Sequence, residues 1–198
     1  MKTDIETVFK HELFFIKDED LKSFVIKIAN CLTPNYFWTA PASSSGKYHP
    51  EFALGKGGLV RHTKVAVWWA VELHRAWEYL PLASLDEIVG AVILHDMLKW
   101  GRSYSDKMHD STSVHGEYLA QQIRLTFPDE SKQYPVMVAA VESHMGVWTK
   151  TEIKRPDKRR PGVTRNTCHL VHMADYCASR KYPTETEIIV NQYKEEDV

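Results

Sequence analysis

Residues 84–99 carry the pattern that most constrains the fold. Ser84 and Glu87 form a capping box, in which two side chains satisfy free N–H groups at the start of a helix. The segment 88–98 that follows is apolar nearly all round, and a helix of this kind has to be buried. We therefore expect a central buried helix that runs from the capping box to about Lys99, covered by the rest of the chain.

The rest of the chain also has helical periodicity. Apolar residues recur at steps of three and four, and prolines or glycines bound the segments. The expected helices span about 21–32, 59–80, 114–127, 136–144 and 166–181, with a further one starting at Thr184. Two long loops, 33–58 and 147–165, separate them, and alternating strand patterns are nearly absent. These features predict an all-α fold.

The composition limits the function classes. The 198 residues suit a single domain, with N-terminal helices in 1–33, a core of about 47–181 and a short tail in 182–198. A net charge of −1 argues against a protein that coats nucleic acid by bulk electrostatics. No apolar run approaches the ~20 residues that a membrane span needs. Three sparse cysteines and a start without a signal-type apolar stretch predict a reduced, cytoplasmic protein.

Ten histidines are an unusual number for this length, and one of them forms the pair His95-Asp96 inside the most apolar segment. Burying an imidazole and a carboxylate costs several kcal/mol unless they are paired or coordinated. Further candidate ligands lie on other expected helices: His62, His115, His144 and Asp175. Each is more often structural when taken singly. Together, imidazoles and carboxylates without thiolates suit Mn, Fe, Co, Ni or Zn.

The order of these residues carries a family resemblance. The matching segments are 57–63 (GGLVRHT), 94–101 (LHDMLKWG), 115–120 (HGEYLA) and 172–180 (HMADYCASR). Over about residues 47–180 the chain resembles the HD-domain metal-dependent phosphohydrolase superfamily. Segments 47–62 and 143–146 look like the HD portion of bacterial 3′→5′ exoribonucleases.

This resemblance implies a compact HD-type helical bundle with long loops around a central metal site. It implies that one ion is bound by His62, His95, Asp96 and Asp175. It also implies a second ion on His115 and His144 that shares Asp96, although these histidines could instead be a general acid and a phosphate donor. We thus expect a divalent transition metal, two ions per chain.

Such a site would carry a charge of about +2, attract a phosphate and lower the pKa of a bridging water, which generates a hydroxide nucleophile. Lys99 matches the lysine of the family's His-Asp-x-x-Lys pattern and could stabilise phosphate charge, or it could simply extend into solvent from a helix end. With Asp96 it forms the predicted catalytic pair. The expected activity is cleavage of a nucleotide or oligonucleotide phosphoester, as a phosphodiesterase, nuclease or phosphatase.

Two segments bear on the substrate. Seven basic residues follow Trp148: Lys150, Lys154, Arg155, Lys158, Arg159, Arg160 and Arg165. They could clamp phosphates and a base, with Trp148, Arg159 and Arg160 in contact, or form a solvated loop. The loop before His62 could supply an opposite wall through His49 and Arg61, or be a packed cover. The predicted partner is a nucleotide or a short single-stranded nucleic acid.

Two other functions remain open from the sequence. HD-like proteins include di-iron enzymes that oxygenate small molecules with the same ligand types. A non-catalytic, nucleotide-binding regulatory module with the same fold is the other alternative. All six expected ligands are present, which favours an enzyme.

Overall fold

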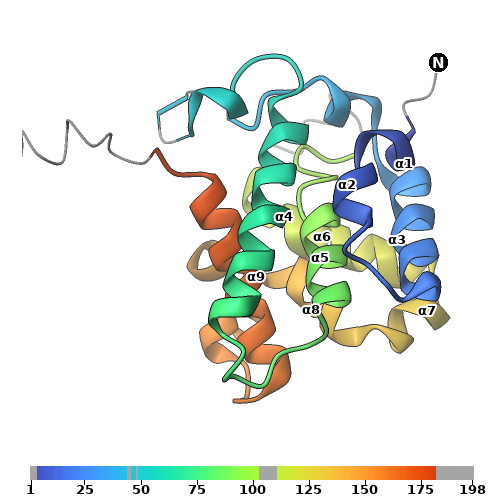
Figure 1. Ribbon diagram of the computed structural model, residues 1–198, viewed down its shortest axis with the longest axis vertical. Helices are drawn as coiled ribbons and strands as arrows, with labels where there is room; N and C mark the ends of the chain where they lie inside the picture. Colours follow the sequence, from blue (N-terminus) through green and yellow to red (C-terminus); the bar gives the residue numbers. More distant parts are fainter. Residues whose placement is uncertain (1–3, 44–45, 48, 103–110, 182–198) are drawn as a thin grey trace, which may run out of the picture.

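The computed structural model describes residues 4–43, 46–47, 49–102 and 111–181, and this part of the chain forms helices and turns without any strand (Figure 1). The fold is therefore all-α, as the sequence predicts. The α-helices are α1 (Ile5–Val8), α2 (Lys10–Leu13), α3 (Glu19–Leu32), α4 (Gly58–Ala76), α5 (Leu85–Leu94), α6 (Ser111–Thr126), α7 (Pro128–Gln133), α8 (Pro135–Ser143) and α9 (Val163–Ala178). The 3-10 helices are η1 (Asn35–Trp38), η2 (Glu51–Ala53), η3 (Gly146–Trp148), η4 (Glu152–Lys154) and η5 (Pro156–Lys158).

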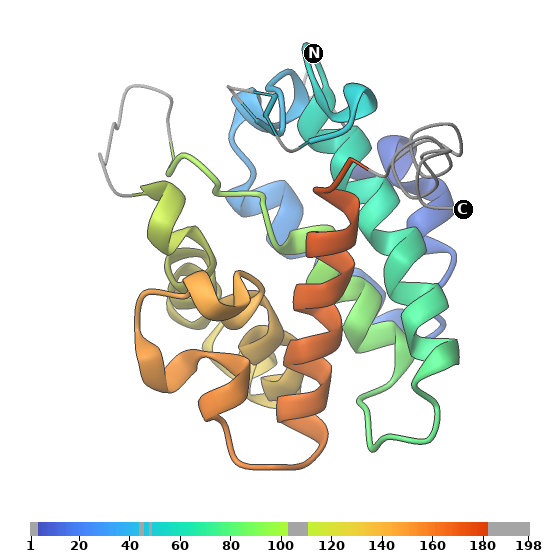
Figure 2. The ribbon, with the colours of Figure 1, turned by 90° about the vertical axis from the view of Figure 1, so that its left-hand side faces the viewer.

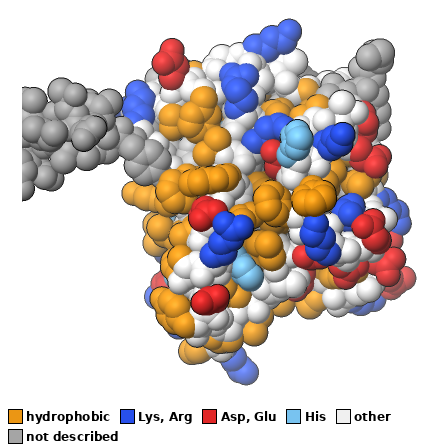
Figure 3. All heavy atoms as spheres, in the orientation of Figure 1, with side chains coloured by type: hydrophobic (Ala, Val, Ile, Leu, Met, Phe, Trp, Pro, Cys, Tyr) orange, Lys and Arg blue, Asp and Glu red, His pale blue; other side chains and the backbone are white. Residues whose placement is uncertain are grey.

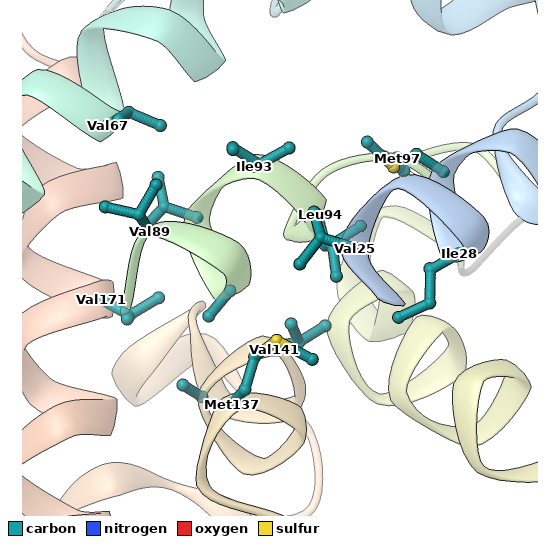
Figure 4. Packing of buried hydrophobic residues seen from close by; sticks show 14 of the residues in the cluster. Val25, Ile28, Val67, Val89, Ile93, Leu94, Met97, Met137, Val141 and Val171 are labelled. Atoms are coloured by element: carbon teal, nitrogen blue, oxygen red, sulfur yellow. The ribbon is translucent and has the colours of Figure 1, made fainter. Parts of the chain in front are cut away.

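Helix α5 is the centre of the core. Its start is fixed by Ser84, whose Oγ accepts a hydrogen bond from the N–H of Glu87 at 3.2 Å. Every residue from Ile88 to Leu94 is buried. Figure 4 shows side chains of α3, α4, α8 and α9 around it, among them Val25, Val67, Met137 and Val171. The helix without a polar face is thus covered on all sides.

Helices α4 and α9 lie side by side and run in opposite directions (Figure 2). Helix α9 also packs against α8, and α8 packs against α6. Because α4 and α9 are antiparallel, the first turns of α4 and the last turns of α9 lie at the same end of the bundle. The turn that follows α5 reaches this end as well.

The central helix is shorter than the sequence suggests. We expected it to continue to about Lys99, but α5 ends at Leu94 and residues 95–100 form turns. The Nδ1 atom of His95 lies 2.6 Å from the carbonyl oxygen of Val92, which a continuing helix would use for Asp96 N–H. Hydrogen bonds from Met97 N–H and Lys99 N–H then reach only three residues back, which tightens the chain.

Other boundaries also differ from the prediction. Helix α4 stops at Ala76 rather than at about residue 80, and α9 begins at Val163 rather than at residue 166. Both long loops contain short 3-10 helices, and α7 was not expected. The expected helix from Thr184 lies outside the described residues.

None of the helices in the described ranges is long and apolar enough to cross a membrane. On the face drawn in Figure 3, Lys and Arg side chains are interspersed with Asp and Glu side chains. This distribution agrees with a net charge of −1.

Candidate metal centre

Six side chains from five separate segments of the chain meet at one end of the bundle. They come from the first turns of α4, the turn after α5, the first turns of α6, the end of α8 and the last turns of α9: His62, His95, Asp96, His115, His144 and Asp175. The four histidines and Asp96 are buried. The structure therefore brings together all six residues that the sequence singled out as ligands.

Asp96 lies between two groups of histidines. Its Oδ1 atom is 2.8 Å from Nε2 of His115 and 3.7 Å from Nε2 of His144. Its Oδ2 atom is 3.6 Å from Nε2 of His95 and 3.8 Å from Nε2 of His62. Each oxygen of one carboxylate thus faces its own pair of imidazoles.

These contacts define two sets of three potential metal ligands. One set is His62, His95 and Asp96, and the other is Asp96, His115 and His144. Within each set the donor atoms all lie within 4.8 Å of one another. Asp175 adds a second carboxylate to the first set, because its Oδ1 atom is 3.0 Å from Nε2 of His62 and 3.6 Å from Nε2 of His95.

Backbone carbonyls orient two of the imidazoles. Nδ1 of His95 lies 2.6 Å from the carbonyl oxygen of Val92, and Nδ1 of His144 lies 2.8 Å from that of Val141. A carbonyl oxygen only accepts hydrogen bonds, so Nδ1 carries the proton in both rings. When the ring is neutral, Nε2 then presents a lone pair to the interior of the site, which is the usual arrangement of a histidine ligand.

The surroundings of His95 test whether a cation fits. Its Nε2 atom is buried and has no hydrogen-bond partner among the described residues, yet two carboxylates lie 3.6 Å away. Burial lowers the pKa of His95, but Asp96 and Asp175 outweigh it and the pKa is raised. The site therefore favours a positive charge at this point. Imidazole and carboxylate donors around it fit a divalent transition metal.

Close approach of two helices positions the second set. A Cβ atom at Gly116 would lie 2.8 Å from both the carbonyl oxygen of Val141 and Nδ1 of His144. The absence of a side chain at Gly116 lets α6 pack directly on α8. As a result, Nε2 of His115 and Nε2 of His144 are only 2.9 Å apart.

Lys99 contacts the shared carboxylate directly, although not from a helix as expected. Its Nζ atom lies 2.6 Å from Oδ2 of Asp96. Burial lowers the pKa of Lys99, but Asp96 and Asp175 outweigh this effect and the pKa is raised, so Lys99 is a cation. Burial raises the pKa of Asp96, but Lys99 and His95 reverse the effect and hold it well below the usual range.

A cavity of about 550 Å³ opens onto this cluster. Asp96, Lys99, His115 and Asp175 are among the residues that line it. The other lining residues are His49, Met145, Trp148, His172, Tyr176, Ser179 and Arg180. Three of the six candidate ligands, Asp96, His115 and Asp175, are therefore reached from the cavity.

His49, expected to contact the substrate, lies at the rim of the cluster, and its ring centroid is 5.8 Å from that of His62. Both ring nitrogens are buried without a hydrogen-bond partner among the described residues. Burial, with repulsion from His62 and Lys99, lowers the pKa of His49 to about 4. The imidazole is therefore neutral at pH 7 and can donate one hydrogen bond and accept another.

Three residues that the sequence assigned to substrate binding do not line this cavity. Arg61 donates to the carbonyl oxygens of Phe52, Leu54 and Lys56 and so fastens the loop before α4. Arg159 and Arg160 line a separate hollow near the start of α9.

Two acidic residues hold the basic loop against the bundle. The buried carboxylate of Glu142 lies 2.7 Å from Arg124, 3.2 Å from Lys154 and 3.0 Å from Arg159. Glu117 accepts from Thr151 and lies 3.2 Å from Lys154. These two carboxylates therefore balance the charges of Lys154 and Arg159, two of the seven basic residues of the loop.

Sequence reasoning missed part of the cavity wall. The Nδ1 atom of His172 lies 2.8 Å from the carbonyl oxygen of His144, and its ring lies beside Gly146, where any Cβ atom would collide with it. Tyr176 and Arg180 were not singled out. Residues 172, 176 and 180 are spaced four apart and so share one helix face next to Asp175. This spacing is the sequence signal that could have identified Tyr176 and Arg180.

Comparison with protein-family models, with curated proteins and with solved structures finds no match for this chain. Its function therefore has to be argued from its own residues.

Proposed function

We propose that this protein is a metal-dependent phosphohydrolase of the HD type, which binds two divalent transition-metal ions and cleaves a nucleotide or oligonucleotide phosphoester. The observation that carries the proposal is the position of Asp96. Each of its oxygens faces one pair of imidazoles, and Lys99, which also lines the cavity, contacts its Oδ2 atom.

The ligand roles follow from the geometry. His62, His95, Asp96 and Asp175 would hold one ion, and Asp96, His115 and His144 would hold the other. When bound, such ions would polarise phosphoryl oxygens and would lower the pKa of a metal-bound water to near neutrality. The carbonyls of Val92 and Val141 keep the imidazoles of His95 and His144 in the tautomer that this requires.

The remaining residues support a phosphate substrate. Lys99 is a cation on the cavity wall and can stabilise negative charge that develops on a phosphoryl oxygen. His49 is neutral at pH 7 and can donate a hydrogen bond to an oxygen of the same group. Neither residue is needed for oxygen activation, which favours a phosphohydrolase over a di-iron oxygenase.

The decisive experiment combines metal analysis with a substrate screen. The purified chain is freed of metal with a chelator and reloaded with Mn²⁺. It is then assayed on nucleoside monophosphates, cyclic nucleotides and short oligonucleotides. We expect about two ions per chain and hydrolysis of at least one of these classes, both lost in Asp96→Ala.

His11→Ala is the matched control, because His11 is an exposed histidine on α2, outside the cluster. It should keep both metal and activity. Two bound ions without hydrolysis of any phosphoester would contradict the proposal. In that case an iron chromophore in protein purified without oxygen would identify the oxygenase instead.

The proposal includes a reducing, cytoplasmic setting. The three cysteines all lie in the described part of the chain, and they form no disulfide.

A further inference from the structure

Part of the wall of the cavity is aromatic, formed by Trp148, His172 and Tyr176. The ring planes of Trp148 and Tyr176 are nearly parallel, 10° apart, with centroids separated by 6.3 Å. His172 packs against both rings, at 6.0 Å from Trp148 and 6.1 Å from Tyr176. The guanidinium of Arg180 lies 4.2 Å from the centroid of Tyr176 on the same wall.

The aromatic wall is exposed to solvent at Trp148. The side chain of Trp148 is 55% exposed, although it is a large aromatic residue in a protein with a well-filled core. It lines the same cavity as Asp96, Lys99 and Asp175. An exposed, flat aromatic face beside a candidate phosphate site is the surface on which a nucleobase stacks.

The wall is also held in place. The backbone N–H of Trp148 donates a hydrogen bond to the carbonyl oxygen of Met145, and Nδ1 of His172 donates one to the carbonyl oxygen of His144. Met145 and His144 directly precede η3, so Trp148 and the candidate ligand His144 are parts of one continuous segment, and the other two aromatic residues come from α9. A base on Trp148 would thus lie at a fixed position relative to the cluster.

The size of the cavity limits what can enter. A volume of about 550 Å³ lies within the range of about 300–1,000 Å³ that small-molecule sites occupy. None of the seven basic residues beyond Trp148 lines this cavity, and three of them have acidic partners. Lys154 and Arg159 pair with Glu142, and Lys158 lies 3.5 Å from Glu152.

We infer that the site is selective for a single nucleotide, whose base stacks on Trp148 against the support of Tyr176 while its phosphate faces Lys99 and Asp96. This inference rests on the proposed function, since it assigns the phosphate to the metal cluster. It narrows the substrate class from nucleotides and oligonucleotides to mononucleotides. It also makes Trp148 a specificity-determining residue.

The test compares two probes that share a phosphate and differ in the base. AMP and ribose 5-phosphate are titrated into the Mn²⁺-loaded protein by calorimetry. The wild type should bind AMP about 5- to 150-fold more tightly than ribose 5-phosphate, which corresponds to the usual contribution of one stacked base. Trp148→Ala should weaken the binding of AMP alone and so remove the difference between the two affinities. Trp148→Phe should keep most of this difference.

Trp68→Ala is the matched control. Trp68 lies on α4, outside the cavity, and is also 55% exposed. Its replacement should change neither affinity. A ratio that survives in Trp148→Ala would overturn the inference, and so would an equal loss of both probes, because Trp148 would then only shape the site. Failure of both probes to bind the wild type would overturn it as well.

A second arm tests the limit to one nucleotide. A short oligonucleotide should bind no more tightly than AMP, and its affinity should change little with salt. Much tighter, strongly salt-dependent binding that is lost when Lys158, Arg159 and Arg160 are replaced by Ala would overturn this part. If the ratio of affinities is as expected but no phosphoester is hydrolysed, the proposed hydrolysis fails and the nucleotide site stands. If phosphoesters are hydrolysed but the affinities show no preference for a base, the inferred nucleotide site fails and the proposed hydrolysis stands.

Discussion

The Nε2 atoms of His115 and His144 lie 2.9 Å apart, although His115 lies on α6 and His144 directly follows α8. The carbonyl oxygen of Val141 fixes the proton of His144 on Nδ1, so a neutral His144 directs a lone pair at His115. Oδ1 of Asp96 approaches the same point at 2.8 Å from His115. Two imidazoles and a carboxylate oxygen that converge in this way have to share a proton or a cation.

Asp96→Ala should therefore remove both metal ions, because this carboxylate contributes to both sets of ligands. His144→Ala should remove about one ion, because it belongs to only one set. Elemental analysis of the purified variants measures this directly, with His11→Ala as the unaffected control. Full metal content in Asp96→Ala would show that the carboxylate does not bridge.

Lys99→Ala should separate metal binding from turnover. The variant loses a cation that competes for Asp96, so its metal content should not fall. Its turnover should fall by about 10²–10³, the usual effect of removing one preorganised charge donor. Steady-state kinetics and elemental analysis on the same sample measure the two quantities. Unchanged turnover would mean that Lys99 only neutralises Asp96.

The six candidate ligands could be selected from the sequence because their selection depends on residue type and order alone. An imidazole next to a carboxylate in an apolar segment is costly anywhere in a fold, so His95 and Asp96 stand out from the pattern of residues by itself. The helix boundary was less predictable. Met97 and Leu98 continue the apolar pattern, although the chain has already left α5 at Leu94.

The cavity wall could not be predicted, because it depends on how distant segments pack. Trp148 and Tyr176 meet only because η3 folds back on α9. The role of the basic loop was equally hidden. The sequence shows its positive charges, but only the fold shows that a buried Glu142 pairs with Lys154 and Arg159.

Gly116→Ala should push α6 and α8 apart. The new Cβ atom would lie 2.8 Å from the backbone oxygen of Val141, which cannot move as a flexible side chain could. Alanine favours a helix over glycine by about 1 kcal/mol, so a loss of stability would show that the clash dominates. We expect a lower free energy of unfolding in urea and about one metal ion per chain.

The control for this variant is Gln121→Ala, an exposed position on the same helix. It should leave both stability and metal content close to those of the wild type. A Gly116→Ala protein that is more stable and still binds two ions would contradict the close packing of α6 on α8.

Glu142→Gln tests the attachment of the basic loop. Burial raises the pKa of Glu142, but hydrogen bonds and charges from Arg124 and Lys154 outweigh it and lower the pKa below 4.5. Because the carboxylate is only 7% exposed, its loss should lower the free energy of unfolding by about 1–3 kcal/mol at pH 7.

The lowered pKa of Glu142 also predicts how the effect of Glu142→Gln on the free energy of unfolding changes with pH. A carboxyl group whose pKa is lower in the folded state stabilises the fold above its unfolded pKa, and this contribution is lost as the pH falls through the folded pKa. The difference in free energy of unfolding between the wild type and Glu142→Gln should therefore be largest at pH 7 and should shrink as the pH falls below 4.5. Urea unfolding of the metal-free proteins at several pH values measures it. Glu152→Gln is the control, because Glu152 is exposed and its replacement should have little effect at any pH. A difference that stays constant down to pH 3 would show that the charge of Glu142 does not hold the loop.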